Sequence, residues 1–354
     1  MAALSKMEIF IRSASCISPQ QTFGSAELPV EVSSFSERKL SAVEPDYKVH
    51  LNLPSARRMS RLIKMGVCAA FSCLQNAGVK IPDAIICGTG LGCMEDSEKF
   101  LASLIDNNEQ TLSPTSFIFS THNTIAAQVA LLLQCNNYNF THTHRGLSFE
   151  NSLLDAMLFV GDHPAANVLV GAADEITSTS FKIFERLGVI KKENEILTDQ
   201  TRGTIAGEGA AFFSLQNNAD QNNLAKIKAV YSFSNPSDAN EIADNVSDFI
   251  DRNNISSNAF ILTGMNDDVN GDNLYHLILK SHFAKNATGY YKHLCGEYHT
   301  STAFACWISA LALKSGKIPG YLLFNNESMV HADQILVFNH YKGREFSLLL
   351  LEKC

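Results

Sequence analysis

The stretch from Asn136 to Glu175 limits the possible folds of this chain more than any other part of it. Tyr138 to Thr143 alternates aromatic and polar residues as a strand does, Gly146 permits a tight turn, and Leu147 to Val160 has the apolar spacing of a helix. Val168 to Val170 is typical of a short buried strand. A strand that breaks sharply into a helix presents its turn to a cleft, where the helix N-terminus favours anionic groups. The succession of strand, helix and strand predicts an α/β fold. Because enzymes place nucleophiles at such turns, we also expect a site here.

Strand and helix patterns continue on both sides of this stretch. Apolar and β-branched runs predict strands at Met7 to Cys16, Ala84 to Cys87, Ile227 to Phe233, Phe260 to Leu262, Ile335 to Phe338 and Phe346 to Glu352. Helical spacing predicts helices at Ala56 to Ala77, Phe117 to Leu133, Asn240 to Ile250 and Thr300 to Leu313. Gln20 to Pro54 lacks a sustained period and should cross the surface, whereas Gln216 to Asn223 should join two halves, residues 1–218 and 219–354.

Composition excludes several classes of partner and compartment. At 354 residues, with 45% apolar and 18% charged residues, the chain is an ordinary globular protein. A net charge of -8 without a basic run makes nucleic acid an unlikely partner. The start lacks a signal-peptide core, and no segment has the apolar length of a membrane span. Nine scattered cysteines without metal-ligand spacing favour the cytoplasm, with no metal and no cofactor.

Other polar motifs have structural interpretations. Gly88 to Gly92 has three glycines but lacks the lysine of a P-loop, so we interpret it as a strand exit where two backbones approach closely. His122 is interpreted as an interface or capping residue. Glu208, between two glycines, is expected to pair with an arginine such as Arg202.

The central stretch resembles the nucleophile turn of the β-ketoacyl synthases, which belong to the thiolase-like superfamily. In that family a cysteine follows the strand and opens the helix, and a GGAE motif similar to GAADE at 171–175 closes the next strand. Counting back from GAADE places the cysteine position on His144, whereas aligning Gly146 with the family's turn glycine places it on Thr143. Neither residue is a cysteine, so the resemblance comes without the attacking thiol.

Three further motifs extend the resemblance along the chain. Thr263 precedes Gly264 where the family's HGT loop has its first active-site histidine. Lys292 matches the lysine of the family's KSMTGH motif, and either Glu297, which we favour, or His293 takes the position of the second histidine. HYKG at 340–343 replaces the family's GFGG loop, which puts Tyr341 where a gating phenylalanine guards the acyl pocket.

The resemblance implies a thiolase-like fold of two pseudo-symmetric halves in α-β-α-β-α layers. Condensation requires a thiolate, an oxyanion hole and two donors that polarise a malonyl thioester, and a carboxylate at Glu297 would repel the enolate. The pattern is similar to short homologues from aryl-polyene and flexirubin clusters and to cysteine-lacking chain-length factors. It implies a non-condensing subunit that pairs with an active synthase, works with an acyl carrier protein and dimerises through Ala126 to Leu133 and Tyr138 to Thr143.

Alternatives stay open at this point. In one, a base and a hydroxyl nucleophile for acyl transfer or thioester hydrolysis are rebuilt from residues that converge in the cleft, namely His142, His144, Ser148, Glu150 and His299. A Ser148 hydroxyl within hydrogen-bond reach of a histidine would support that hypothesis. In another, His142 and His144 simply fill a closed former pocket; a third hypothesis is a scaffold without any pocket.

Overall fold

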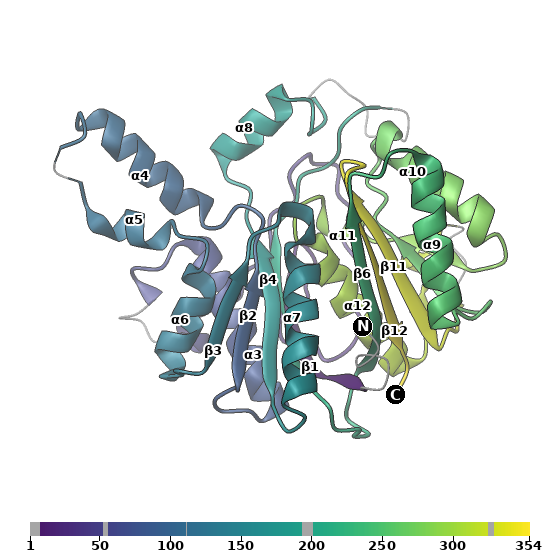
Figure 1. The fold of residues 1–354 in the computed structure, drawn as a ribbon. Helices are drawn as coiled ribbons and strands as arrows, with labels where there is room; N and C mark the ends of the chain where they lie inside the picture. The colour runs from purple at the N-terminus through teal and green to yellow at the C-terminus, as the bar shows by residue number, and fades with distance from the viewer. Residues whose placement is uncertain (1–7, 52–55, 111, 193–200, 325–328) are drawn as a thin grey trace.

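Most strands of the protein form one ten-stranded mixed sheet (Figure 1). The computed structural model describes residues 8–51, 56–110, 112–192, 201–324 and 329–354. The N-terminal strands are β1 (Ile9–Ile17), β2 (Ala84–Gly88), β3 (Tyr138–His142), β4 (Val168–Asp174) and β5 (Gly209–Gln216). They lie in the order β3-β2-β4-β5-β1, with β2 parallel to β3 and β4, and β5 antiparallel to β4 and β1.

The C-terminal strands repeat this arrangement. They are β6 (Ala225–Ser234), β7 (Phe260–Thr263), β8 (Thr288–Tyr290), β11 (Gln334–Tyr341) and β12 (Glu345–Glu352). Their order β8-β7-β11-β12-β6 and their pairing directions match those of the first five strands, and β1 pairs with β6 to join the two sets. The chain therefore has two pseudo-symmetric halves, and we propose residue 218, between β5 and β6, as their boundary.

Helices form three layers around the strands. Contacts place α3 (Arg61–Ala77) and α6 (Thr124–Leu133) against the N-terminal strands, and α7 (Ser148–Asp162) and α12 (Ser301–Ser315) between the two sets of strands. On the other side, α9 (Ala239–Asn253) and α10 (Val269–His282) share an apolar core with the C-terminal strands. The result is the α-β-α-β-α layering that the family resemblance implies.

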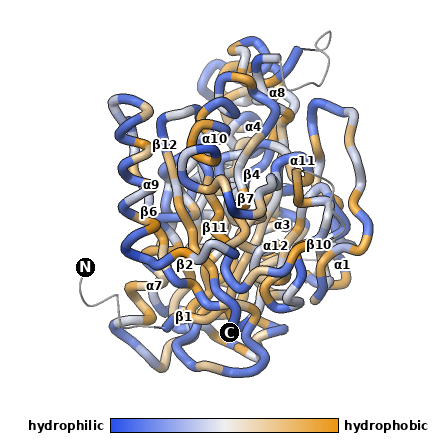
Figure 2. The backbone as a smooth tube through the Cα atoms, turned by 90° about the vertical axis from the view of Figure 1, so that its right-hand side faces the viewer, coloured by the Kyte–Doolittle hydropathy of each residue, from blue (hydrophilic) through white to orange (hydrophobic). Residues whose placement is uncertain are grey.

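The middle layer shows why the sequence adopts this arrangement. Every residue of α12 from Ser301 to Leu313 is buried, as expected for a helix that is apolar on all sides. In Figure 2 the hydrophobic colouring runs along the central strands, while hydrophilic residues gather toward the periphery. Within the described ranges, no helix has the length and apolar character needed to cross a membrane.

The helix predicted from Phe117 to Leu133 is in fact two helices. They are α5 (Pro114–Phe119) and α6, and the chain breaks because the Thr124 hydroxyl bonds to the carbonyls of Phe119 and Thr121. The sequence did not predict α4 (Met94–Asp106) or α8 (Ser178–Arg186), and α4 and α5 project together from the body in Figure 1. The short elements are α1 (Tyr47–His50), α11 (Lys292–Cys295), β9 (Ile318–Pro319), β10 (Met329–Val330), and the 3-10 turns η2 (Arg145–Leu147) and η3 (Gly320–Leu322).

Two loop expectations have clear outcomes. The segment after β1, which was expected to cross the surface, lies beside α11, since Gln20 Nε2 donates to the Leu294 carbonyl over 3.1 Å. Glu208 pairs with Arg61 through two hydrogen bonds of 2.6 Å, so the expected pairing with Arg202 is wrong. Arg61 lies 147 residues before Glu208, and no local pattern links the two.

Candidate functional site

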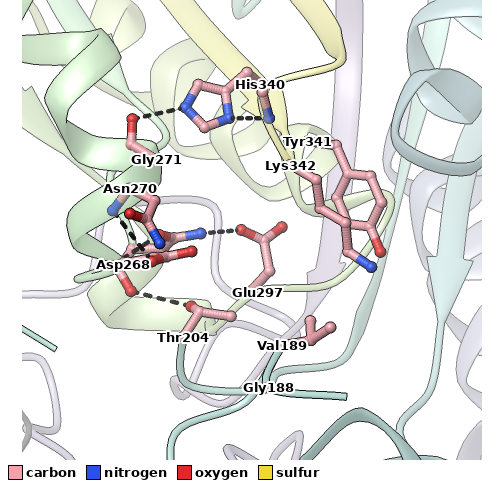
Figure 3. A pocket seen from close by; sticks show the side chains of 12 residues that line it. Gly188, Val189, Thr204, Asp268, Asn270, Gly271, Glu297, His340, Tyr341 and Lys342 are labelled. Atoms are coloured by element: carbon pink, nitrogen blue, oxygen red, sulfur yellow. Dashed lines mark hydrogen bonds between the residues drawn. The ribbon is translucent and has the colours of Figure 1, made fainter. Parts of the chain in front are cut away.

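A cavity of 240 Å³ lies at the ends of the C-terminal strands, beside the Glu297 loop (Figure 3). Four segments meet there: the loop from β7 into α10, the β11–β12 hairpin, the Glu297 loop and the residues after α8. The lining residues are Gly188, Val189, Thr204, Asn266, Asp268, Asn270, Gly271, Glu297, His340, Tyr341, Lys342 and Gly343. A second cavity of 40 Å³ shares Val189, Thr204, Glu297 and Tyr341 with it and extends to His299.

Glu297 stands at the junction of the two cavities and is already paired. Its Oε2 lies 2.7 Å from Lys292 Nζ and also accepts a hydrogen bond from the Asn266 amide. The two ion-paired side chains are 1% and 10% exposed, Lys292 being the more buried. An ionised carboxylate accepts hydrogen bonds and has no hydrogen to donate to a substrate, unlike a histidine.

Tyr341 fills the space between the cavity and the turn after β3. Its ring lies 4.7 Å from that of His299, and a side chain at Gly146 would come within 2.4 Å of the Tyr341 Cβ. His299 packs in turn against Gly90, where a Cβ would lie 2.3 Å from the His299 Cβ. Burial lowers the pKa of His299, so the ring stays neutral at neutral pH. Tyr341 and His299 thus separate the cavity from the turn.

The turn itself carries no group poised for attack. Thr143 and His144 are exposed, and neither lines the cavities. His144 Nδ1 lies 3.0 Å from the Asn151 amide, while Ser148 Oγ is buried and donates to the backbone carbonyls of Thr89 and Arg145. Ser148 also accepts from the His144 N–H over 2.8 Å. The condition for a rebuilt serine site, a histidine side chain bonded to Ser148, is therefore not met.

The other predicted site residues point elsewhere. Thr263 is buried and donates to the Gly289 carbonyl over 2.8 Å. His293 Nε2 lies 3.0 Å from the Tyr321 carbonyl, and burial lowers its pKa to about 4. His142, at the end of β3, lies 3.1 Å from Asp155. The structure therefore gathers Lys292, Glu297, His299 and Tyr341 but leaves His142, Thr143, His144, Ser148, Thr263 and His293 outside the cavities.

Glu150 does not join a catalytic group either. It lies in the middle layer, and neither of its carboxylate oxygens has a hydrogen-bond partner among the described residues. Burial raises its pKa to about 7. The convergence of His142, His144, Ser148, Glu150 and His299 that the rebuilt-site hypothesis requires does not occur. Within the described part of the chain, no three His, Cys, Asp or Glu side chains group as metal ligands.

Comparison with known proteins supports the resemblance. Residues 37–196 match the family model for the N-terminal domain of β-ketoacyl synthases. The resemblance based on the turn and the GAADE motif is thereby confirmed. No curated protein sequence matches the chain.

Solved structures of ketosynthases share the fold of this chain over nearly its whole length. The ishigamide ketosynthase/chain length factor gives a TM-score of 0.78 at 16% identity, covering 98% of this chain and 99% of that one. A β-ketoacyl synthase from Burkholderia phymatum STM815 gives 0.80 at 14% identity, with 98% and 100% covered. A type II polyketide synthase acyl-carrier protein in complex with its ketosynthase gives 0.75 at 14% identity, with 98% and 99% covered. The thiolase-like fold is confirmed.

Sequence reasoning missed several cavity residues. Asn266, Asp268 and Asn270 belong to a polar loop without a motif, and Lys342 was noted only as part of the HYKG replacement. The Asn-Asp content of 266–273 was the available signal, because such residues cap helices, and Asp268 does cap α10. Nothing in the local sequence indicates that this cap faces the β11–β12 hairpin.

Proposed function

We propose that this chain is a non-condensing, chain-length-factor-like subunit that pairs with an active synthase in biosynthesis of the fatty-acid or polyketide type. The observation that carries the proposal is the turn after β3, where exposed Thr143 and His144 replace a nucleophilic thiol. Decarboxylative condensation needs a thiolate to hold the acyl chain and donors to stabilise an enolate. A subunit without them contributes through its shape and its contacts.

No other cysteine supplies the missing thiolate. Eight of the nine cysteines are buried, and the exposed one, Cys354, ends the chain beside the cavity between β1 and β12 rather than the one beside Glu297. Cys295, the cysteine nearest to Glu297 in sequence, donates its thiol to the Gly296 carbonyl, and burial raises its pKa well above the usual value. A protonated, buried thiol is a poor nucleophile. Cys295 therefore does not replace the missing group.

The positions of the two donors are also unsuited to condensation. The Thr263 hydroxyl already donates its hydrogen to the Gly289 carbonyl. Glu297 offers a carboxylate, which repels an enolate, and its ion pair with Lys292 occupies the nearest cation. Both departures support a role without condensation by this chain alone.

The edge of the sheet supports pairing with another subunit. β3 is an edge strand whose Tyr138 and Phe140 are exposed, and Leu131 of α6 and Leu158 of α7 are exposed beside it. An uncovered edge strand with aromatic side chains favours pairing with a second chain. We therefore propose that this surface, made of Leu131, Tyr138, Phe140 and Leu158, binds the synthase partner in a dimer.

The remaining parts of the proposal concern setting and partners. All nine cysteines are free thiols, which supports a reducing cytoplasm. An acyl carrier protein is proposed as a further partner because one structural neighbour is a ketosynthase held by its acyl-carrier protein. The aryl-polyene type of pathway rests on the sequence resemblance alone.

Co-expression with a ketosynthase encoded beside it tests the proposal. We expect the two chains to co-elute on size exclusion, and the pair to extend malonyl units from a carrier protein while this chain alone does not. Phe140→Asp should abolish co-elution, because it buries a charge at the edge strand. Leu277→Asp on α10 is the matched control, since Leu277 is 49% exposed and Phe140 47%. Condensation by the purified chain alone, lost on His144→Ala, would contradict the proposal.

A further inference from the structure

Lys342 brings a cation without an ion pair into the cavity beside Glu297. Its Nζ lies 5.2 Å from the centre of the Tyr341 ring and 6.0 Å from that of Phe184, and these cation–π contacts leave its N–H groups free to donate. Among the described residues, no carboxylate comes within ion-pair distance of it. Figure 3 shows Lys342 alongside Tyr341, with Glu297 coming from a different element.

The charges around Lys342 make an anion favourable there. Burial and the charges of Arg145 and Arg344 lower the pKa of Lys342, and they outweigh the opposing effect of Glu297 and Glu345. The carboxylates in the neighbourhood are already engaged: Glu345 accepts from the Gly146 N–H over 2.8 Å, and Glu297 from Lys292. Lys342 is exposed and has no ion pair among the described residues, so its ammonium can make a charge-assisted hydrogen bond to an anion.

The backbone at Lys342 is strained. Tyr341 O accepts from the Arg344 N–H over 3.1 Å, and the two central residues of this turn, Lys342 and Gly343, have φ of 53° and 63°. Two positive φ values belong to a type I′ turn, which prefers Asn, Asp or Gly at its first central position. Lysine is not among these residues, so the turn holds it at a conformational cost.

The opposite wall of the cavity offers acceptors. The Asp268 side chain caps α10 by accepting a hydrogen bond from the Asn270 N–H. A carboxylate has two oxygens, so it can accept further hydrogen bonds. Asp268 and Asn270 both line the cavity. A volume of 240 Å³ is below that of pockets for drug-sized ligands, and Tyr341 blocks the way toward the turn. The space therefore suits a short polar molecule and excludes a long acyl chain.

We propose that this cavity binds a short carboxylate that also carries a hydrogen-bond donor, with its carboxylate on Lys342 and its donor on Asp268. The site is independent of the proposed pairing with a synthase, because every group in it belongs to this chain. It can therefore be tested on the purified protein without a partner, and its failure would leave the pairing proposal untouched.

Isothermal titration of the full-length protein with 3-hydroxybutyrate tests the proposal. This probe has a carboxylate for Lys342 and a hydroxyl for Asp268, whereas butyrate lacks the donor and inorganic phosphate lacks the chain. We expect saturable binding of 3-hydroxybutyrate, with butyrate and phosphate each weaker. Lys342→Met should weaken binding about tenfold or more, as loss of a charged hydrogen bond does. Asp268→Asn should reduce the preference for 3-hydroxybutyrate over butyrate.

The control is Lys280→Met, which removes an exposed lysine from the second half of α10 and should leave binding unchanged. Circular dichroism of each variant separates loss of binding from loss of folding. Three outcomes would overturn the proposal: no saturable binding of 3-hydroxybutyrate, equal binding by folded Lys342→Met, or phosphate binding tighter than the carboxylate through Lys342. Equal affinity for butyrate would overturn the role of Asp268.

Discussion

Lys292 and Glu297 form an ion pair of 2.7 Å in which both side chains are almost fully excluded from water. Lys292 is the first residue of the short helix α11, so the pair ties the start of α11 to the loop that follows it. The family resemblance places Lys292 on an active-site lysine and Glu297 on an active-site histidine. In the structure the Glu297 carboxylate accepts a hydrogen bond from its neighbour Lys292.

Replacing Glu297 with alanine should destabilise the protein by about 3 kcal/mol, because it leaves the Lys292 charge buried without a partner. Urea unfolding measures the change. The control is Asp248→Asn, which breaks the Arg252–Asp248 pair whose side chains are 72% and 66% exposed, and which should cost less than about 1 kcal/mol. Similar losses in both variants would show that the Lys292–Glu297 pair is not effectively buried.

Gly88→Ala should lower the free energy of unfolding by about 3 kcal/mol. A Cβ at Gly88 would lie 2.6 Å from the Ser148 carbonyl oxygen, and backbone atoms at the start of α7 have no room to yield. Gly78→Ala is the comparison: Gly78 has φ of 72° and no atom near its Cβ position, so only backbone strain of about 1 kcal/mol is expected. Equal effects in urea unfolding would contradict the close approach of β2 and α7.

The strands and the main helices could be predicted because their residues carry the pattern themselves. The apolar runs at β11 and β12 and the stripe of α3 are local signals, and the structure places elements over each of them. The helix α4 was missed because its only buried residue is Asp96, which leaves no apolar stripe to detect. Hydrophobic periodicity in a sequence reflects burial of one helix face, and α4 buries very little of its surface.

The site was less predictable for a different reason. Glu297 and Tyr341 were found through motifs, whereas the place of Lys342 depends on the register of β11 with β12 and on a turn of positive φ. Nothing in the sequence around Lys342 shows that Asp268 lines the same cavity. Such long-range placement becomes visible only in the folded chain.

Stability should fall as pH rises through the titration range of Glu150. Burial raises its pKa from 4.5 to about 7, so the native state binds the proton more tightly than the unfolded chain does. The free energy of unfolding therefore decreases between pH 4.5 and about 7, by up to about 3 kcal/mol, and this contribution is constant above that range.

Glu150→Gln isolates this effect, because other buried acids such as Glu175 titrate equally in both proteins. We expect the stability of Glu150→Gln relative to wild type to increase from pH 4.5 to 7 and then to level off. Urea midpoints at steps of half a pH unit measure it, with the exposed Asp248→Asn variant as the control that should show no such slope. A constant difference across this range would contradict a buried, protonated Glu150.

Lys342→Asn should stabilise the protein while it weakens carboxylate binding, as Lys342→Met does. Asparagine followed by glycine is the preferred pair for a type I′ turn, so the variant relieves the strain of a lysine at φ 53°. It also removes the repulsion among Lys342, Arg145 and Arg344. We expect a gain of about 1 kcal/mol in urea unfolding, at the upper end of what turn optimisation gives. Lys280→Asn, in the last turn of α10, should instead lower the free energy of unfolding by a few tenths of a kcal/mol, about the difference in helix propensity between the two residues. A destabilised Lys342→Asn would show that the contacts of Lys342 with Tyr341 and Phe184 stabilise the fold more than the turn strain destabilises it. The lysine would then be explained by stability, and its presence would not require a ligand.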